Sequence, residues 1–393
     1  MRNTAAWLLA AVVALSLVAG CATPRGESGA LRDLKAGERP TLDSDEAGLW
    51  MAMDRVEANL RTSGRIIADP ALNSYVRTLV CRLTPPHCDG IRIYVVQTPH
   101  VNASMAPNGM MQIWTGLLLH AENEAQVAYV LGHEIGHYVR RHSVQQFRDL
   151  RTKAAASVFF TTLAGAAGVG FVGPLIQLAT VSSVFAFSRD NEREADDVGF
   201  ELMVAAGYDA HEAPKIWETL LAQRAATKNP QASIFFATHP PTEERVATLK
   251  ALAEKTGSPR DERDAGRDRF LAATLPFRTS MLRDELRLRR FAATQLLLDR
   301  LSATDSASGE IQFFQGELYR LRAESGDEAR AIVAYEKAIG AGDAPAEAYR
   351  SFGLVLMNAR ERSRARAALD RYLELRPDAT DREMIREYVK RLE

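Results

Sequence analysis

The chain has 393 residues, of which 46% are hydrophobic and 25% charged, so it can bury a large core and should divide into two or three domains. Its 49 basic and 50 acidic side chains leave a formal net charge of −1. This balance excludes the basic footprint of a nucleic-acid-binding protein and points to no acidic surface as a partner.

The N-terminus has the pattern of an export signal. Arg2 precedes an apolar run from Ala5 to Val18, which ends in Val-Ala-Gly-Cys21. The run is too short and too early for a transmembrane helix, and it resembles a bacterial lipoprotein signal cleaved before a lipidated Cys21. Ala22 and Thr23 follow without an Asp, which resembles lipoproteins sorted to the outer membrane of Gram-negative bacteria. The alternative is an ordinary secretory signal cleaved after another small residue.

Export changes the interpretation of the other two cysteines, Cys81 and Cys88. The chain turns sharply between them at Pro85 and Pro86. A disulfide is therefore expected in an oxidising periplasm, with a small benefit of about 2 kcal/mol because the loop is short. Free buried thiols are the alternative.

Residues 101–116 contain Pro107-Asn-Gly109 between two short runs of strand-forming residues. This pattern predicts a hairpin. In one interpretation the hairpin lies beside a cleft. In the other, Met110, Ile113 and Trp114 are core residues of a small sheet that includes 91–96.

The segment Leu131-Gly-His-Glu-Ile-Gly-His137 carries the strongest chemical signal. On a helix, His133 and His137 lie one turn apart on the same face, so both imidazoles can bind one tetrahedral Zn²⁺. Glu134, about 100° further round the helix, points toward the water that such a metal would hold. His142 would lie about 180° from His133 on a continuing helix and is not expected to be a ligand.

Residues 154–187 contain no charged side chain. Gly-rich residues 165–174 divide the segment into two parts that are short for membrane spans, so two helices packed over the zinc helix are expected. Re-entrant membrane insertion is the alternative.

A third ligand is found in Ser188-Arg-Asp-Asn-Glu-Arg-Glu-Ala-Asp-Asp-Val-Gly199. If this segment is helical, Glu192 and Asp196 share a face, whereas Glu194 lies about 200° from Glu192. Glu192 would complete a His₂Glu zinc site, and Asp196 would accept the outer N–H of a ligating histidine.

These motifs, followed by His239-Pro-Pro-Thr-Glu-Glu-Arg245, resemble the HtpX/BepA-like zinc metalloendopeptidases, which are relatives of the CaaX prenyl proteases. The resemblance runs from about Asp45 to Leu252. It implies a gluzincin-type domain that holds one Zn²⁺ on two histidines and a glutamate, here His133, His137 and Glu192, with Glu134 as general base.

The resemblance further implies that His239 and Arg245 close over the site. His239 would either stabilise the oxyanion or occupy the open zinc position in a resting state; the alternative is a histidine that caps the loop before the next helix. In the family a strand lies along the site and binds extended substrate by main-chain hydrogen bonds. The predicted substrate-binding residues are therefore Ala103, Ser104, Met105, Met110, Met111 and Ile113.

After a charged linker at 256–267, helical patterning continues to the C-terminus and contains an internal repeat. Small and aromatic residues recur at tetratricopeptide spacing in one copy (Tyr349, Gly353, Ala365, Leu369, Pro377) and in the preceding copy (Gly316, Tyr319, Ala331, Tyr335, Ala338). Residues 282–301 supply an earlier, degenerate unit, and 381–392 a closing helix. Such surfaces bind segments of other proteins.

The sequence thus predicts a mostly α, α+β protein. We expect a signal peptide (1–20), a linker (21–45), a zinc metallopeptidase domain (46–255), a charged linker (256–268) and an α-solenoid of repeats (269–393). The expected function is that of a lipid-anchored periplasmic metalloendopeptidase, attached to the outer membrane, that hydrolyses misfolded or stalled envelope proteins. The alternative is a chaperone or assembly scaffold whose zinc site is mostly closed. A dead peptidase domain is disfavoured because no ligand is missing.

Overall fold

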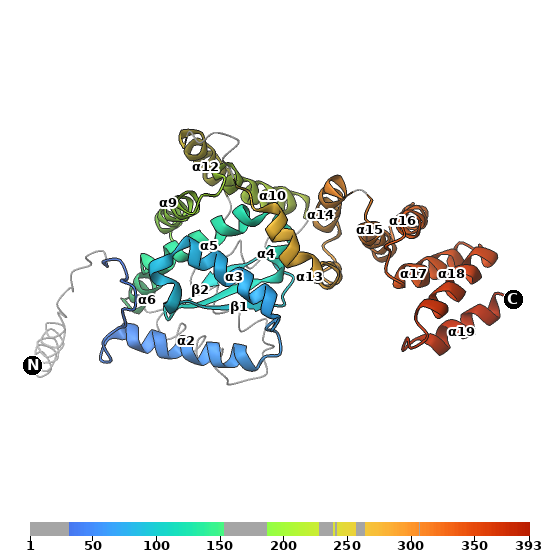
Figure 1. Ribbon diagram of the computed structural model, residues 1–393, viewed down its shortest axis with the longest axis horizontal. Helices are drawn as coiled ribbons and strands as arrows, with labels where there is room; N and C mark the ends of the chain where they lie inside the picture. Colours follow the sequence, from blue (N-terminus) through green and yellow to red (C-terminus); the bar gives the residue numbers. More distant parts are fainter. Residues whose placement is uncertain (1–30, 153–186, 228–238, 240–241, 257–263, 306) are drawn as a thin grey trace, which may run out of the picture. The chain divides into compact units, whose positions relative to one another are not determined.

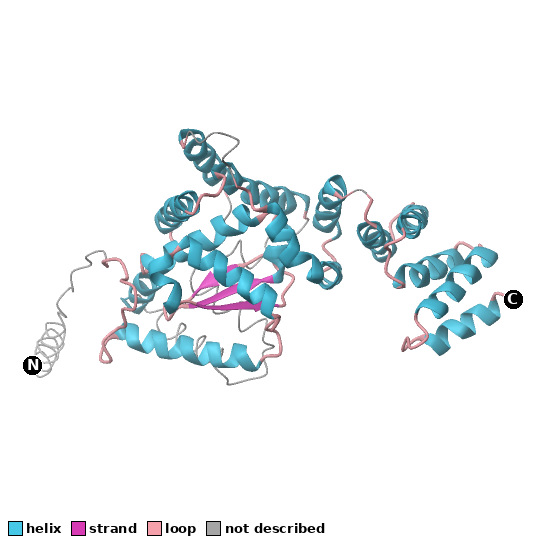
Figure 2. Cartoon of the chain, in the orientation of Figure 1, coloured by secondary structure: helices cyan, strands magenta, loops and turns pink. Residues whose placement is uncertain are grey.

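The computed structural model of the chain describes residues 31–152, 187–227, 239, 242–256, 264–305 and 307–393. Within these ranges the structure has one three-stranded sheet. The rest is mostly helical, as Figure 2 shows. The predicted α+β class with a predominance of helix is therefore confirmed. Residues Asp33–Glu393 form one compact unit.

Residues 45–255 contain the sheet and the helices before the C-terminal part. Side-chain caps fix the starts of two of these helices, α5 and α9. Asn123 accepts a hydrogen bond from the Gln126 amide at the start of α5, and Ser188 accepts one from the Asn191 amide at the start of α9. In chain order the elements are α2 (Asp45–Thr62), α3 (Pro70–Leu83), the 3₁₀ helix η1 (Pro85–Gly90), β1 (Arg92–Val96), β2 (Ala103–Met105), β3 (Met110–Trp114), α4 (Thr115–His120), α5 (Glu124–Val139), α6 (His142–Thr152), α9 (Arg189–Ala205), η2 (Ala210–Glu212), α10 (Ala213–Ala226) and α12 (Glu243–Lys255).

The sheet has the strand order β1-β3-β2, with β3 parallel to β1 and antiparallel to β2. The predicted hairpin is confirmed: Gly109 has a φ of +88°, and Asn108 accepts a hydrogen bond from the Met110 amide in the turn. Because β3 is paired on both sides and buried along its whole length, it offers no edge to a peptide. The prediction that Met110, Met111 and Ile113 bind substrate is therefore wrong, since these residues belong to the core.

The two cysteines after the N-terminal region are joined. Cys81 in α3 and Cys88 in η1 form a disulfide, and their Cα atoms lie 4.8 Å apart. This is the predicted pairing, and it ties the end of α3 to the chain that enters β1.

Helices α5 and α9, labelled in Figure 1, pack at close range because small residues face each other there. A Cβ atom on Gly132 would lie 2.9 Å from the carbonyl oxygen of Gly199, and one on Gly136 would lie 3.2 Å from the Cα of Ala195. Both α5 glycines belong to the segment Leu131–His137. The segment therefore carries the packing surface for α9 as well as the metal-binding residues.

A Gly199→Ala substitution should destabilise the protein and lower its metal content. The added Cβ would lie 2.6 Å from the backbone nitrogen of His133, so α5 and α9 would have to separate. Overpacking of this kind costs about 1–3 kcal/mol, which thermal unfolding measures. The control is Gly48→Ala on α2, where a Cβ meets no atom within 4 Å and the change should be neutral or stabilising by up to ~1 kcal/mol. Wild-type stability and zinc content in Gly199→Ala would contradict the close crossing.

The C-terminal part consists of helices joined by short connections. Two glycines mark close contacts between successive helices: a Cβ on Gly316 would lie 2.5 Å from the Tyr335 ring, and one on Gly353 would lie 2.6 Å from Leu369. All four residues belong to the predicted repeat pattern, and the assignment to tetratricopeptide repeats stays a prediction. The helices are α13 (Arg267–Arg287), α14 (Phe291–Thr304), α15 (Gly309–Arg322), α16 (Asp327–Ala341), α17 (Glu347–Asn358), α18 (Arg362–Leu375) and α19 (Arg382–Arg391).

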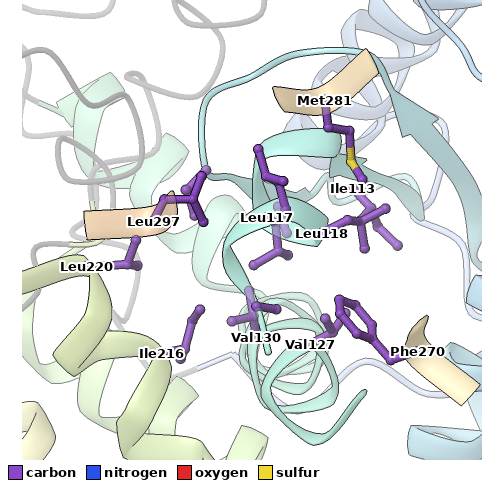
Figure 3. Close-up of a cluster of buried hydrophobic side chains, with 14 of the residues drawn as sticks. Ile113, Leu117, Leu118, Val127, Val130, Ile216, Leu220, Phe270, Met281 and Leu297 are labelled. Atoms are coloured by element: carbon purple, nitrogen blue, oxygen red, sulfur yellow. The ribbon is translucent and has the colours of Figure 1, made fainter. Parts of the chain in front are cut away.

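One hydrophobic core extends from the helices around α5 into α13 and α14. In Figure 3, Phe270 of α13 lies next to Val127 of α5, and Leu297 of α14 lies near Leu220 of α10. These residues are almost fully buried. The first two C-terminal helices are therefore packed against the part of the chain that carries α5.

The uncharged segment 154–187, except for Phe187, lies outside the described residues, as do the signal sequence and Cys21. Among the helices of the described ranges, none combines the length and the apolar character needed to cross a membrane.

Candidate metal centre

Three histidines and one glutamate converge in the interior of the protein. His133 and His137 project from α5, Glu192 from α9, and His239 from the residues before α12. One potential ligand atom from each lies within 4.8 Å of the others, and all four side chains are buried. The His137 and His133 Nε2 atoms are 3.1 Å apart, and His239 Nδ1 lies 3.3 Å from His133 Nε2 and 2.9 Å from Glu192 Oε1.

The donor set fits zinc. Imidazole nitrogens bind tetrahedral Zn²⁺ at ~2.0–2.1 Å, which places ligand atoms about 3.3 Å from one another. The observed separations of 3.1 and 3.3 Å from His133 Nε2 are close to this value. Each neutral imidazole has only one N–H, so hydrogen bonds among the rings cannot satisfy all the nitrogens that meet here. The residues predicted to hold the metal are thus brought together, with His239 as a fourth.

Asp196 lies behind His133, on the side opposite the converging nitrogens. Its Oδ1 is 2.9 Å from His133 Nδ1 and accepts a hydrogen bond of 2.6 Å from the Tyr129 hydroxyl. Burial alone would raise the pKa of Asp196, but Arg245 and His133 hold the pKa well below its usual range. The carboxylate therefore stays ionised and orients His133 with Nε2 toward the cluster.

Arg245 does not close over the site as predicted. It lies on the Nδ1 side of His133, donates from Nε to Asp196 Oδ2 at 2.7 Å and pairs with Glu192 Oε2 at 2.9 Å. Its guanidinium group also lies 4.0 Å from the centre of the Trp217 ring. Through these contacts Arg245 holds the carboxylates of Asp196 and Glu192 in place, which is the role of a positioning residue.

Glu134 is next to the cluster and has an unused oxygen. Among the described residues its buried Oε1 has no hydrogen-bond partner, and it lies 3.4 Å from His239 Nε2. Burial raises the pKa of this carboxyl, and His239 and His133 offset the shift only in part. A carboxylate with a raised pKa and a free oxygen can accept a proton from a water molecule beside the cluster.

His142 is also in a position that the sequence did not predict. The expectation of one continuing helix is wrong, because α5 ends at Val139 and Arg141 adopts a φ of +59°. The chain bends there, and His142 comes to lie against His137, with their Nδ1 atoms 2.9 Å apart. His142 is not part of the convergent cluster, as expected, but it contacts a member of it.

Three aromatic residues of the site were missed. The Tyr129 hydroxyl donates a hydrogen bond to Asp196 and accepts one of 3.1 Å from Trp217 Nε1. Phe187 stacks on His137, with ring centroids 3.9 Å apart. Tyr129 lies four residues before His133 on the same helical face, so its spacing could have identified it. Trp217 and Phe187 carry no such signal, because only the tertiary structure brings them near.

The edge strand β2 reaches the site through Met105. Asn102 and Ala106 make main-chain hydrogen bonds toward β3, so the intervening Ala103 and Met105 point their main-chain groups away from β3. The Met105 amide donates to Glu134. Of the predicted substrate residues of β2, Met105 therefore adjoins the candidate base.

Comparison with known proteins gives consistent results. Residues 67–253 match the profile of peptidase family M48. The chain is 28% identical over 232 residues to the putative beta-barrel assembly-enhancing protease of Vibrio cholerae, covering 56% of this chain and 46% of that protein. It is 28% identical over 211 residues to the beta-barrel assembly-enhancing protease of Escherichia coli K12, covering 50% of this chain and 42% of that protein.

Another group of relatives is mitochondrial. The chain is 38% identical over 140 residues to the mitochondrial metalloendopeptidase OMA1 of Arabidopsis thaliana, covering 34% of this chain and 27% of that protein. In each of these three comparisons the match spans less than half of the relative's length.

Proposed function

Because residues 67–253 form a zinc metallopeptidase domain of family M48, we propose that the protein is an endopeptidase acting on misfolded or stalled proteins of the bacterial envelope. The observation that carries the proposal is the buried cluster of His133, His137, Glu192 and His239 beside Glu134. Two relatives named as beta-barrel assembly-enhancing proteases support this class of substrate.

In this proposal the zinc ligands are His133, His137 and Glu192. Zinc, when bound, polarises the scissile carbonyl and lowers the pKa of the attacking water. Glu134 accepts the proton of that water and later delivers it to the leaving amine. Asp196 keeps the proton of His133 on Nδ1, so that the Nε2 lone pair faces the metal.

The substrate would bind as an extended segment along β2. Ala103 and Met105 direct main-chain groups away from β3. The Met105 amide already donates to Glu134, so substrate would pair with the remaining outward groups, which gives affinity with little sequence preference. Ser104 points its main chain toward β3, so its contribution would be limited to its side chain. This arrangement suits a protease of unfolded chains, which differ in sequence but share the same backbone.

We further propose that the protein is a lipoprotein anchored through Cys21 to the periplasmic side of the outer membrane. The lipoprotein-like signal before Cys21 and the disulfide between Cys81 and Cys88 support an oxidising, extracytoplasmic location. The domain limits remain as predicted, with the peptidase domain at 46–255. The helices from 269 onward would form tetratricopeptide-like repeats that bind a protein partner or client.

A second candidate function is that of a chaperone or assembly scaffold with a closed zinc site. The position of His239 favours it, because this side chain lies within the ligand cluster and contacts Glu192 and His133. A fourth protein ligand would complete the coordination shell and leave no position for water.

Metal analysis tests the proposed function first. The purified chain should hold about one Zn²⁺, and His133→Ala should lose the metal and all proteolysis, because the remaining ligands no longer enclose it. The control is His211→Ala, since His211 is bonded to Asp209 outside the cluster and should retain zinc. Equal zinc in wild type and His133→Ala would refute the ligand assignment.

A further inference from the structure

The outer nitrogen of His137 faces a second histidine, whereas that of His133 faces a carboxylate. His137 Nδ1 lies 2.9 Å from His142 Nδ1. His142 is 1% exposed, and its other nitrogen, Nε2, lies 3.1 Å from Glu194 Oε2. The three side chains form a continuous line of hydrogen bonds that starts at the metal cluster and ends at a half-exposed carboxylate.

The backbone places these groups through two separate features. The bend at Arg141 returns the chain onto the end of α5, so that His142, the first residue of α6, meets His137. Glu194 comes from α9 and is held by Arg140, whose Nε lies 3.1 Å from Glu194 Oε1. Glu194 points away from Glu192 along α9, as the sequence predicted, but it reaches the outer side of the same cluster.

If His137 bound zinc through Nε2, the positions of the ring protons on His137 and His142 would both be fixed. A metal-binding Nε2 carries no proton, so the proton of His137 is on Nδ1 and is donated to His142. His142 must then accept at Nδ1, which leaves its own proton on Nε2, where it is donated to Glu194. Only one arrangement of protons satisfies all three groups when His137 is a ligand.

We propose that His142 and Glu194 are positioning residues that fix His137 as an Nε2 ligand of zinc, by holding its proton on Nδ1. The inference rests on the proposed function, since it assigns these two residues to the same zinc site. Asp196 acts on His133 directly, whereas Glu194 acts on His137 through His142. The two histidine ligands thus have separate orienting partners on α9, one buried and one at the surface.

Zinc affinity of the full chain, measured by competition with a chromophoric chelator, tests this proposal. Outer partners of ligating histidines typically change metal affinity by about 10–100-fold, so His142→Ala should raise the zinc dissociation constant by that factor. Glu194→Ala should raise it by about tenfold. His142→Asn should recover most of the loss, because the Asn Oδ1 can take the place of the His Nδ1 acceptor.

The double variant His142→Ala/Glu194→Ala shows whether Glu194 acts through His142 or whether the two residues affect zinc affinity independently. Because Glu194 acts through His142, Glu194→Ala should add no further loss in the His142→Ala background. The matched control is Glu201→Ala, an exposed glutamate on the same helix, which should leave the dissociation constant unchanged. Unfolding temperatures measured with excess chelator show whether any variant has simply lost its fold.

The outcomes are distinct. If wild type binds no zinc, the proposed function fails. If wild type binds zinc and both His142→Ala and Glu194→Ala bind it equally well, the positioning role is overturned. The role is also overturned if the two losses add fully in the double variant, or if His142→Asn is as weak as His142→Ala. Glu194 lies at the surface, so its variant remains informative even if His142→Ala does not fold.

Discussion

Glu134→Gln is expected to abolish proteolysis while leaving the zinc content and the fold of the protein unchanged. Glutamine keeps the shape of the side chain but cannot accept a proton, so the rate should fall by about a thousandfold or more. The side chain is 2% exposed, and its Oε1 has no hydrogen-bond partner among the described residues. The variant therefore loses no hydrogen bond of that oxygen to them, and it removes only the negative charge that faces His239 Nε2 at 3.4 Å. Degradation of unfolded casein, with metal analysis of the same samples, measures the effect.

Two comparisons sharpen this experiment. Glu201→Gln makes the same chemical change at an exposed position of α9 and should degrade casein at the wild-type rate. If Glu134→Gln also retains that rate, Glu134 is not the base. If Glu134→Gln has no proteolysis but restores every phenotype of a deletion strain, the scaffold is the physiological function.

His239→Ala should increase basal proteolysis if His239 closes the site at rest. The structure favours this role over that of an oxyanion donor, because His239 Nδ1 lies among the potential ligands, 2.9 Å from Glu192 Oε1 and 3.3 Å from His133 Nε2. Removal of a competing ligand opens the position for water. The rate should then rise about tenfold for each ~1.4 kcal/mol by which the closed state is favoured.

The opposite role predicts the opposite sign. Loss of an oxyanion donor should reduce turnover by about a hundredfold or more. Rates of wild type and His239→Ala on one unfolded substrate therefore decide between the roles, provided that the variant still holds zinc on the other three residues. His211→Ala is the matched control. A large fall in rate excludes closure by His239, and an unchanged rate excludes both roles.

The sequence by itself determined the parts of the site that depend on helical periodicity. His133 and His137, like Glu192 and Asp196, lie on one face of a helix because residues four apart are neighbours on any α-helix. The Pro-Asn-Gly hairpin is local in the same sense, since its turn is set by adjacent residues. These elements needed no knowledge of the rest of the fold.

Contacts between distant segments were decided by the tertiary structure alone. The pairing of β3 with β1 made Met110, Met111 and Ile113 core residues, although the hairpin pattern allowed them to face a substrate. The alternation of residues within a strand shows which side chains share a face. It does not show which strand is central in the sheet.

The bend after α5 is the clearest case of a feature that the local sequence does not predict. Arg141 adopts a left-handed φ that glycine usually provides, so the sequence around it reads as continuous helix and places His142 on the wrong side. Arg141 is held there by an ion pair with Glu46 of α2, and the bend brings His142 to His137 and Glu194. Sequence periodicity thus determined His133, His137 and Glu192 of the cluster and the Asp196 carboxylate behind it. Tertiary packing decided that His142 and Glu194 lie against His137, because they come from segments whose approach no local pattern encodes.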